Sequence, residues 1–280
     1  IDPTSGLGNG VTVTHYLELN GKIDLVGESQ LIQTTDSDLV VGTNGMLERD
    51  QQGEGNRFRY NDWSSPVYTE TGGDITVNGT GNYTTVAAAL KDGSLPDNAT
   101  YPRDITFVTG YDGGVGPPIE IANFWINKYA NLPDNNYSAW QQVGSTGRIY
   151  AGEGFLMKGT GDAGAQPDQN YVFQGKPNNG DITLTIGAGN DYLVGNPYPS
   201  VLDANKFISD NGPSGTNSIS GTLYFWEHYG GDTHNLADYQ AGYGTYNYSG
   251  STPAASAATA HPDVNGGGSA AKTPGRYIAV

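Results

Sequence analysis

The chain passes twice through the same series of sequence landmarks, and this repetition constrains its fold more than any other feature. Each series contains a proline turn, an aromatic strand, a second aromatic strand and a strand with the pattern Gly-Arg-aromatic. The landmarks lie at 60–67, 124–125, 137–140 and 147–155 in the first copy and at 193–200, 225–226, 239–243 and 275–280 in the second. Such internal similarity predicts two related β-units. The second copy stops inside its last strand pattern, so we expect the chain to be part of a longer protein.

The composition agrees with many short strands joined by turns. Only 36% of the residues are apolar, whereas the chain has 42 glycines and 19 tyrosines. Residues that favour turns (Gly, Asn, Asp, Ser and Thr) separate the short apolar segments, a pattern typical of all-β proteins. We therefore predict an all-β fold with one or two short helices.

The charge restricts the partners. Thirteen basic and 29 acidic residues give a formal net charge of −16. This negative field repels nucleic acids and anionic membranes, so neither is an expected partner. No run reaches the roughly 18 apolar residues of a membrane helix, so we expect no membrane insertion in this segment. The chain has no cysteine, but a core of this size needs no disulfides, so the compartment stays open.

Two interpretations fit the N-terminal region, 1–56. Apolar and polar residues alternate over 11–19, which indicates a half-buried strand. The following pair, Asn20 and Gly21, favours a β-hairpin turn. Leucines at 19, 25 and 31 are spaced by six, which suits the turns of a β-solenoid. The pattern leaves open whether this region is a short β-solenoid or is hairpin-rich.

Two related β-sandwich-like units are predicted to follow, over 57–177 and 178–280, with the second one truncated at its C-terminal end. Helices are expected at 85–93, capped by Thr85, and at 203–208, capped by Asp203. Strands are predicted at 105–109, 119–129, 148–158, 171–174, 182–186, 192–195, 223–229 and 239–248. The segment 251–274 is rich in Ala, Gly, Ser and Thr and is predicted to be a long exposed loop.

Several motifs resemble those of a known group of proteins. They are Asp-Trp-Ser-Ser-Pro-Val at 62–67, Gly-Glu-Gly-Phe-Leu-Met-Lys-Gly at 152–159, Phe-Gln-Gly-Lys-Pro-Asn-Asn-Gly at 173–180 and Gly-Asn-Pro-Tyr-Pro-Ser at 195–200. Together they resemble large adhesin-like surface proteins of Bacteroidota, especially flavobacteria, that the type IX secretion system exports. The segment 17–25 is similar to the solenoid-like region that often precedes such modules. The resemblance implies a secreted or surface-attached β protein and carries no catalytic residues to this chain.

Metal-binding residues are a weaker hypothesis. His228, Asp232 and His234 lie within seven residues and could share a metal, although no helical pairing supports a zinc site. Asp36, Asp38 and Asp134 lie in Asp/Asn-rich loops that offer the oxygen ligands Ca²⁺ prefers. Turn formation through the Asp and Asn side chains explains the same loops without a metal, and it is the favoured interpretation. Calcium is thus a possible ligand, and no cofactor is certain.

Aromatic residues are the main candidates for contact with a glycan or a partner. They are dense on the aromatic strands: Trp125, Trp140, Trp226, Tyr239 and Tyr243. Exposed rings can stack on sugars or form a protein interface, whereas buried ones would fill the core between sheets.

The sequence contains no nucleophile elbow, no zinc-protease motif and no phosphate-binding loop, so an enzyme is not expected. We predict a non-enzymatic structural or adhesive module of a long extracellular surface protein or filament. The alternative is a carbohydrate-binding module that uses exposed Trp and Tyr. Expected partners are other copies of the chain, other surface proteins or glycans.

Overall fold

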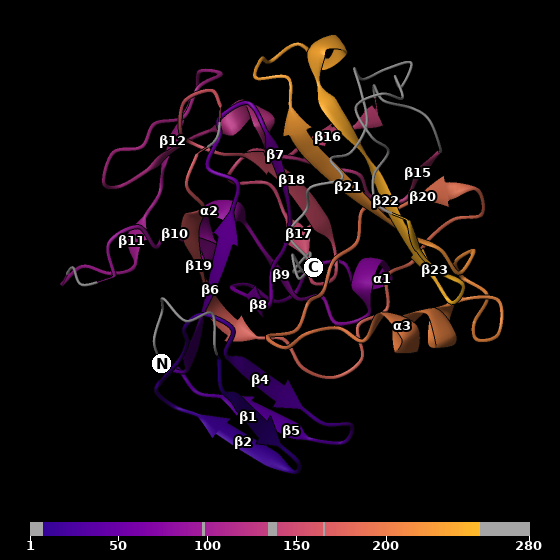
Figure 1. The fold of residues 1–280 in the computed structure, drawn as a ribbon. Coiled ribbons are helices and arrows are strands. Elements are labelled where there is room, and N and C mark those ends of the chain that lie inside the picture. The colour runs from indigo at the N-terminus through magenta and orange to yellow at the C-terminus, as the bar shows by residue number, and fades with distance from the viewer. Residues whose placement is uncertain (1–7, 97–98, 134–138, 165, 253–280) are drawn as a thin grey trace.

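The computed structural model describes residues 8–96, 99–133, 139–164 and 166–252. Over these ranges the protein is all-β, as predicted: short strands form several small sheets, and the three α-helices are short (Figure 1). The helices are α1 (Ile75–Asn78), α2 (Val86–Ala89) and α3 (Ala204–Asn211). Within the described ranges, no helix has the length and hydrophobicity needed to cross a membrane.

The N-terminal region is a β-solenoid of two turns, at the bottom of Figure 1. The first turn consists of β1 (Gly10–Val13), β2 (Tyr16–Leu19) and β3 (Lys22–Leu25). The second consists of β4 (Gln30–Gln33), β5 (Asp38–Val41) and the start of β6 (Met46–Gly53). Each strand of the first turn pairs in parallel with its counterpart in the second.

Of the two interpretations, the solenoid is therefore confirmed and the hairpin at Asn20–Gly21 is wrong. This pair is a corner between β2 and β3, and the neighbouring carbonyls bond to the next turn: Gly42 N donates to Leu19 O, and Met46 N to Gly21 O, both at 2.9 Å. The residues that follow this spacing of six are all buried in the solenoid: Val13, Leu19, Leu25, Leu31 and Ser37.

Strand β6 leaves the solenoid and enters the centre of the molecule. It pairs antiparallel with β19 (Gln169–Pro177) over seven residue pairs. The resulting sheet has the order β11-β10-β19-β6-β3, and β8 (Val67–Tyr68) also pairs with β19. Strand β11 (Arg103–Asp104) forms one edge and is followed inwards by β10 (Leu90–Asp92), and β3 of the solenoid forms the other edge. The predicted regions 1–56 and 57–177 therefore share one sheet.

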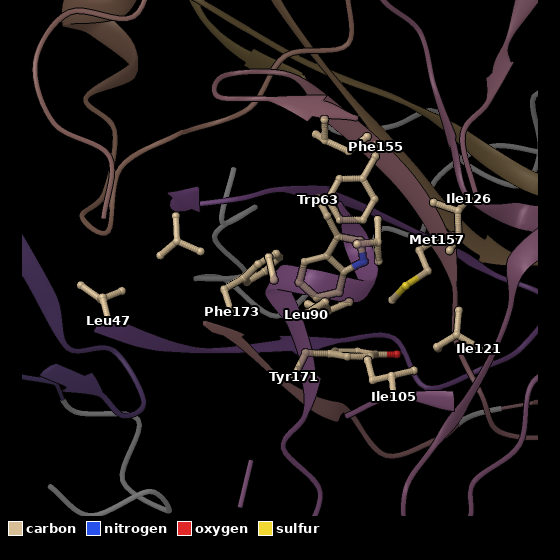
Figure 2. Packing of buried hydrophobic residues seen from close by; sticks show 14 of the residues in the cluster. Leu47, Trp63, Leu90, Ile105, Ile121, Ile126, Phe155, Met157, Tyr171 and Phe173 are labelled. Carbon is tan, nitrogen blue, oxygen red and sulfur yellow. The ribbon is translucent and has the colours of Figure 1, made fainter. Parts of the chain in front are cut away.

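A second sheet packs on the first and encloses the core. Its order is β16 (Gln141–Gln142), β14 (Asn127–Lys128), β18 (Gly154–Lys158) and β7 (Tyr60–Ser64). Trp63 of β7 lies between the sheets, with its ring centroid 5.3 Å from that of Tyr171 and 5.9 Å from that of Phe173 (Figure 2). Phe155 and Met157 of β18 extend the same buried layer.

The described part of the C-terminal region forms a third sheet. It contains β21 (Leu223–Gly230), β22 (Gln240–Asn247) and β23 (Gly250–Thr252), all antiparallel (Figure 1). Helix α3 lies beside it, because the hydroxyls of Tyr246 and Tyr248 bond to Oδ1 and O of Asn205. The turn η3 (Leu236–Asp238) joins β21 to β22.

The remaining strands form small pairs. β12 (Thr106–Val108) pairs in parallel with β13 (Glu120–Ala122). Antiparallel pairs join β15 (Leu132–Pro133) to β20 (Asn190–Asp191) and β9 (Tyr83–Thr84) to β17 (Ile149–Tyr150).

The predicted duplication has a counterpart in strand pairing. The segments next to the two aromatic landmarks pair antiparallel in both halves, β14 with β16 and β21 with β22. The last landmark of the second copy, 275–280, lies outside the described residues, as does much of the predicted loop at 251–274.

Four local predictions need correction. At 192–195 the expected strand is reduced to a single bridge between Val194 and Glu153. The expected strand at 124–125 is a 3₁₀ turn, η1 (Asn123–Trp125), closed by a bond from Ile126 N to Asn123 O. The expected strand at 182–186 is irregular, because Thr185 bonds to the end of α1 rather than to a strand. The helix predicted at 85–93 ends after one turn, because Leu90 already pairs with β19.

Candidate binding surfaces

A buried lysine at the end of β18 contacts the segment that joins β21 to β22. Lys158 is only 2% exposed, and its Nζ is 3.8 Å from the ring centroid of Trp125. The rings of Tyr60 and Tyr239 lie at 4.8 and 5.0 Å from the same atom. Nζ also bonds to Tyr239 Oη at 2.7 Å and to His234 Nδ1 at 3.1 Å. We call these five residues the Lys158 cage.

The cage changes the protonation of its lysine. Burial lowers the pKa of Lys158 to about 7, although the negative charge of Asp112 acts in the opposite direction. Asp112 Oδ1 lies 3.0 Å from Nε2 of His234, so a hydrogen-bonded chain runs from the lysine through the imidazole to a carboxylate. A partly neutral amine is a nucleophile in principle, but this one is shielded from solvent by rings. The arrangement therefore attaches the hairpin to the sheet.

Two of the predicted contact residues belong to this cage. Tyr239 is 3% exposed and cannot meet a ligand in this conformation. Trp125 stacks on His234 with centroids 4.8 Å apart, and its Nε1 donates to Tyr111 O. Trp140, which is half-buried, packs edge-on against Tyr129 at 5.3 Å.

The predicted metal ligand His228 has both ring nitrogens engaged by backbone. Tyr60 N donates to Nδ1 at 3.2 Å, and Nε2 lies 3.0 Å from Gly230 O. Burial lowers the pKa of His228 to about 4, and the positive charge of Lys158 acts in the same direction. The neutral ring therefore links β7 to β21, and neither nitrogen is left to bind a metal.

Asp232 and His234 also have other partners. Asp232 accepts from Asn56 Nδ2 at 2.8 Å, from Gly164 N at 2.6 Å and from Arg59 Nε at 3.2 Å. His234 is held by the Lys158 cage. Nowhere in the ranges 8–96, 99–133, 139–164 and 166–252 do three or more His, Asp or Glu side chains come together as a metal site.

The three calcium candidates differ in their positions in the fold. Asp36 is an exposed corner residue between β4 and β5 with a φ of 67°, a conformation that Asp tolerates better than most residues. Asp38 is exposed at the start of β5, and Asp134 lies outside the described residues. Calcium binding stays a prediction.

Trp226 and Tyr243, in contrast, lie on a surface. They are directly opposed on β21 and β22, with ring centroids 4.9 Å apart. Tyr224 continues the row, 6.3 Å from Tyr243 and perpendicular to it. Tyr224 is 63% and Tyr243 55% exposed. We call these three residues the aromatic ladder. The sequence prediction missed Tyr224, although its spacing of two from Trp226 places both on one face of a strand.

Carboxylates lie near one end of the ladder. Burial, followed by the negative charges of Asp62 and Asp191, raises the pKa of Tyr243. Burial raises the pKa of Asp62 itself to about 7. Its Oδ1 is buried and has no hydrogen-bond partner among the described residues. This oxygen is closed to solvent, so a ligand on the exposed rings cannot reach it in this conformation.

The described residues thus form an all-β protein with an exposed aromatic surface and a lysine buried under a hairpin. A family model described as "Domain of unknown function (DUF8693)" matches residues 118–277, more than half of the chain. The protein belongs to this family. The matched range begins just before β13 and contains the aromatic ladder and most of the Lys158 cage. No curated protein and no solved structure matches the chain.

Proposed function

We propose that the chain is a non-enzymatic structural or adhesive module of an extracellular surface protein and that it attaches to its partner through the aromatic ladder. The observation that carries this proposal is the row of Tyr224, Tyr243 and Trp226. The ring of Tyr243 meets both of the others, and the two tyrosines are exposed whereas Trp226 is half-buried. Tyr and Trp contribute large contact areas at little entropic cost and are enriched at binding hot spots.

The surroundings of the ladder support this role. Its residues lie on β21 and β22 of a three-stranded antiparallel sheet. Lys158 of β18 bonds to Tyr239, the residue just before β22, so the rings are presented on a rigid support. Lys158, the cation with a lowered pKa, is too deeply buried to reach a substrate. The extracellular location rests on the resemblance of motifs 62–67, 152–159, 173–180 and 195–200 to secreted surface proteins.

The test is retention of protein-coated beads on surfaces of mucin, chitin, cellulose and serum albumin. The double variant Tyr224→Ala/Tyr243→Ala should lower retention on the recognised surface about tenfold, because loss of hot-spot rings costs more than about 1 kcal/mol. Tyr16→Ala is the matched control, since Tyr16 is an equally exposed tyrosine on the solenoid. Equal retention of the parent and the double variant would remove the ladder from the mechanism.

Carbohydrate binding is the second candidate function, favoured by the exposed rings of Tyr224 and Tyr243 beside Trp226. A sugar offers a flat apolar face that can stack on such rings. If this is the function, soluble oligosaccharides should compete with bead retention, and glycan-array binding should vanish in Trp226→Ala. If no glycan of a broad array binds, carbohydrate binding is excluded and the proposal keeps only a protein partner.

A further inference from the structure

A hollow with a volume of about 340 Å³ opens next to η1, away from the residues of the ladder. It is lined by the end of β12, by η1 and by β16 with the turn that follows: Thr109, Asn123, Phe124, Gln142, Val143 and Gly144. The volume lies at the small end of ligand pockets in proteins, which span roughly 300–1,000 Å³. The hollow can thus hold a small polar molecule or one unit of a longer chain.

The walls of this hollow are fixed by hydrogen bonds. Gln142 Nε2 donates to Phe124 O at 2.9 Å, and Val143 N donates to Ile126 O at 3.0 Å. Ser145 N donates to Asn123 Oδ1 at 2.5 Å. Such bonds hold the lining residues in place before a ligand arrives, which reduces the entropic cost of binding.

Gly144 shows how closely one wall is built. Its φ is 56°, a region that favours glycine, and a Cβ there would lie 3.0 Å from Asn123 Oδ1. The side chain of Asn123 therefore lies directly over the glycine, and both contribute to the lining. The backbone therefore holds this wall in place without a bound ligand.

The lining offers the two features that sugar recognition uses, an aromatic surface and hydrogen-bonding groups. Phe124 is 42% exposed and meets Tyr111 edge-on at 4.8 Å, so an aromatic surface borders the hollow. Asn123 Nδ2, Gln142 Oε1 and Thr109 Oγ1 have no hydrogen-bond partner in the part of the chain that the structure describes. They provide a donor, an acceptor and a hydroxyl that can act as either.

The ligand class follows from charge. None of the six lining residues is charged, and the whole chain carries a net charge of −16. Among the described lining residues, a phosphate or carboxylate would find no cation and a metal ion no carboxylate. From these features we infer that the hollow beside Phe124 binds a neutral saccharide unit, with one ring face on Phe124 and its hydroxyls bonded to Thr109, Asn123 and Gln142. This site is separate from the aromatic ladder and stands even if the ladder binds only protein.

Isothermal titration with cellohexaose, mannohexaose and chitohexaose, and with polygalacturonate as the acidic comparison, tests this inference. At least one neutral oligosaccharide should bind, and polygalacturonate should not. Thr109→Val, which keeps the shape and removes the hydroxyl, should weaken binding about tenfold, as should Phe124→Ala. Thr106→Val is the matched control, an exposed threonine of β12, three residues before Thr109 and outside the hollow.

The outcomes separate this site from the ladder. Binding that survives Tyr224→Ala/Tyr243→Ala but weakens in Thr109→Val supports the hollow. Binding that survives Thr109→Val and Phe124→Ala but is lost in the ladder variant overturns the inference and supports the carbohydrate form of the proposed function. Absence of binding to all three neutral oligosaccharides, or tighter binding of polygalacturonate, also overturns it. Because Thr109 is exposed, its variant stays informative if Phe124→Ala loses stability.

Discussion

Lys158 shows how a single residue can hold two elements together without a carboxylate in direct contact. Three aromatic rings surround its ammonium group. The nearest ring centroid, that of Trp125, lies 3.8 Å from Nζ. A desolvated cation over an aromatic ring gains about 2 kcal/mol or more, which offsets part of the cost of burial. The remainder of that cost is visible as the lowered pKa of the lysine.

The lowered pKa predicts a dependence of stability on pH. The pKa of Lys158 is about 7 in the folded protein, against its ordinary value of 10.5. Between about pH 7 and pH 10 the unfolded chain binds a proton at this residue that the folded chain does not, so stability rises with pH across this window, by at most about 1.4 kcal/mol per pH unit. Lys158→Met should remove this rise, measured as urea unfolding midpoints from pH 6 to 10.

The control for this measurement is Lys206→Met. Lys206 is exposed on α3 and forms an ion pair with Asp210. Its variant should show the same pH dependence as the parent. Parallel curves for the parent and Lys158→Met would mean that the lysine keeps its ordinary pKa in the folded state.

Among the elements, α3 depends most clearly on its first residues. Asp203 caps the helix by accepting from Lys206 N at 3.0 Å, and the helix in turn holds the hairpin through Asn205. Asp203→Ala should lower the free energy of unfolding by about 1 kcal/mol, the usual value of such a cap. Ser209→Ala, at an exposed position of the same helix, should change it by less than about 0.5 kcal/mol. Equal effects in urea titrations would show that the cap contributes nothing.

In the whole molecule, β6 couples the solenoid to the central sheet, because this strand belongs to both. We therefore expect the two parts to unfold in a single transition. Leu25→Ala removes a buried side chain of the solenoid and should shift that entire transition, at a cost of about 2–5 kcal/mol. Calorimetry and circular dichroism should report the same midpoint, and Val40→Ala, at an exposed site, should leave it in place. A separate early transition in Leu25→Ala would contradict this coupling.

Features with a local cause could be predicted from the sequence. The caps at Thr85 and Asp203 and the all-β class follow from neighbouring residues alone. The leucines spaced by six were visible, but only the pairing of β1–β3 with β4–β6, about 20 residues away, separates a solenoid from hairpins. The same limit applies to η1, where a bond from Ser145 to Asn123 helps to bend a segment that has the composition of a strand.

The candidate surfaces divide in the same way. Trp226 and Tyr243 were predicted as contact residues from their strand pattern and lie on the surface. Trp125 and Tyr239 have equally aromatic surroundings in sequence but meet Lys158, a residue far from both along the chain. The hollow beside Phe124 combines three separate segments, so no local pattern could indicate it.

The position of β6 also determines how the protein would carry mechanical load. The strand is bonded in parallel to β3 over four residue pairs and antiparallel to β19 over seven. Ladder hydrogen bonds of an antiparallel pair lie across the strand axis. Tension applied along β6 therefore acts on them in shear, and many bonds must break together rather than one after another. A pull entering through the solenoid would be distributed across both neighbours of β6 before it reached the core around Trp63.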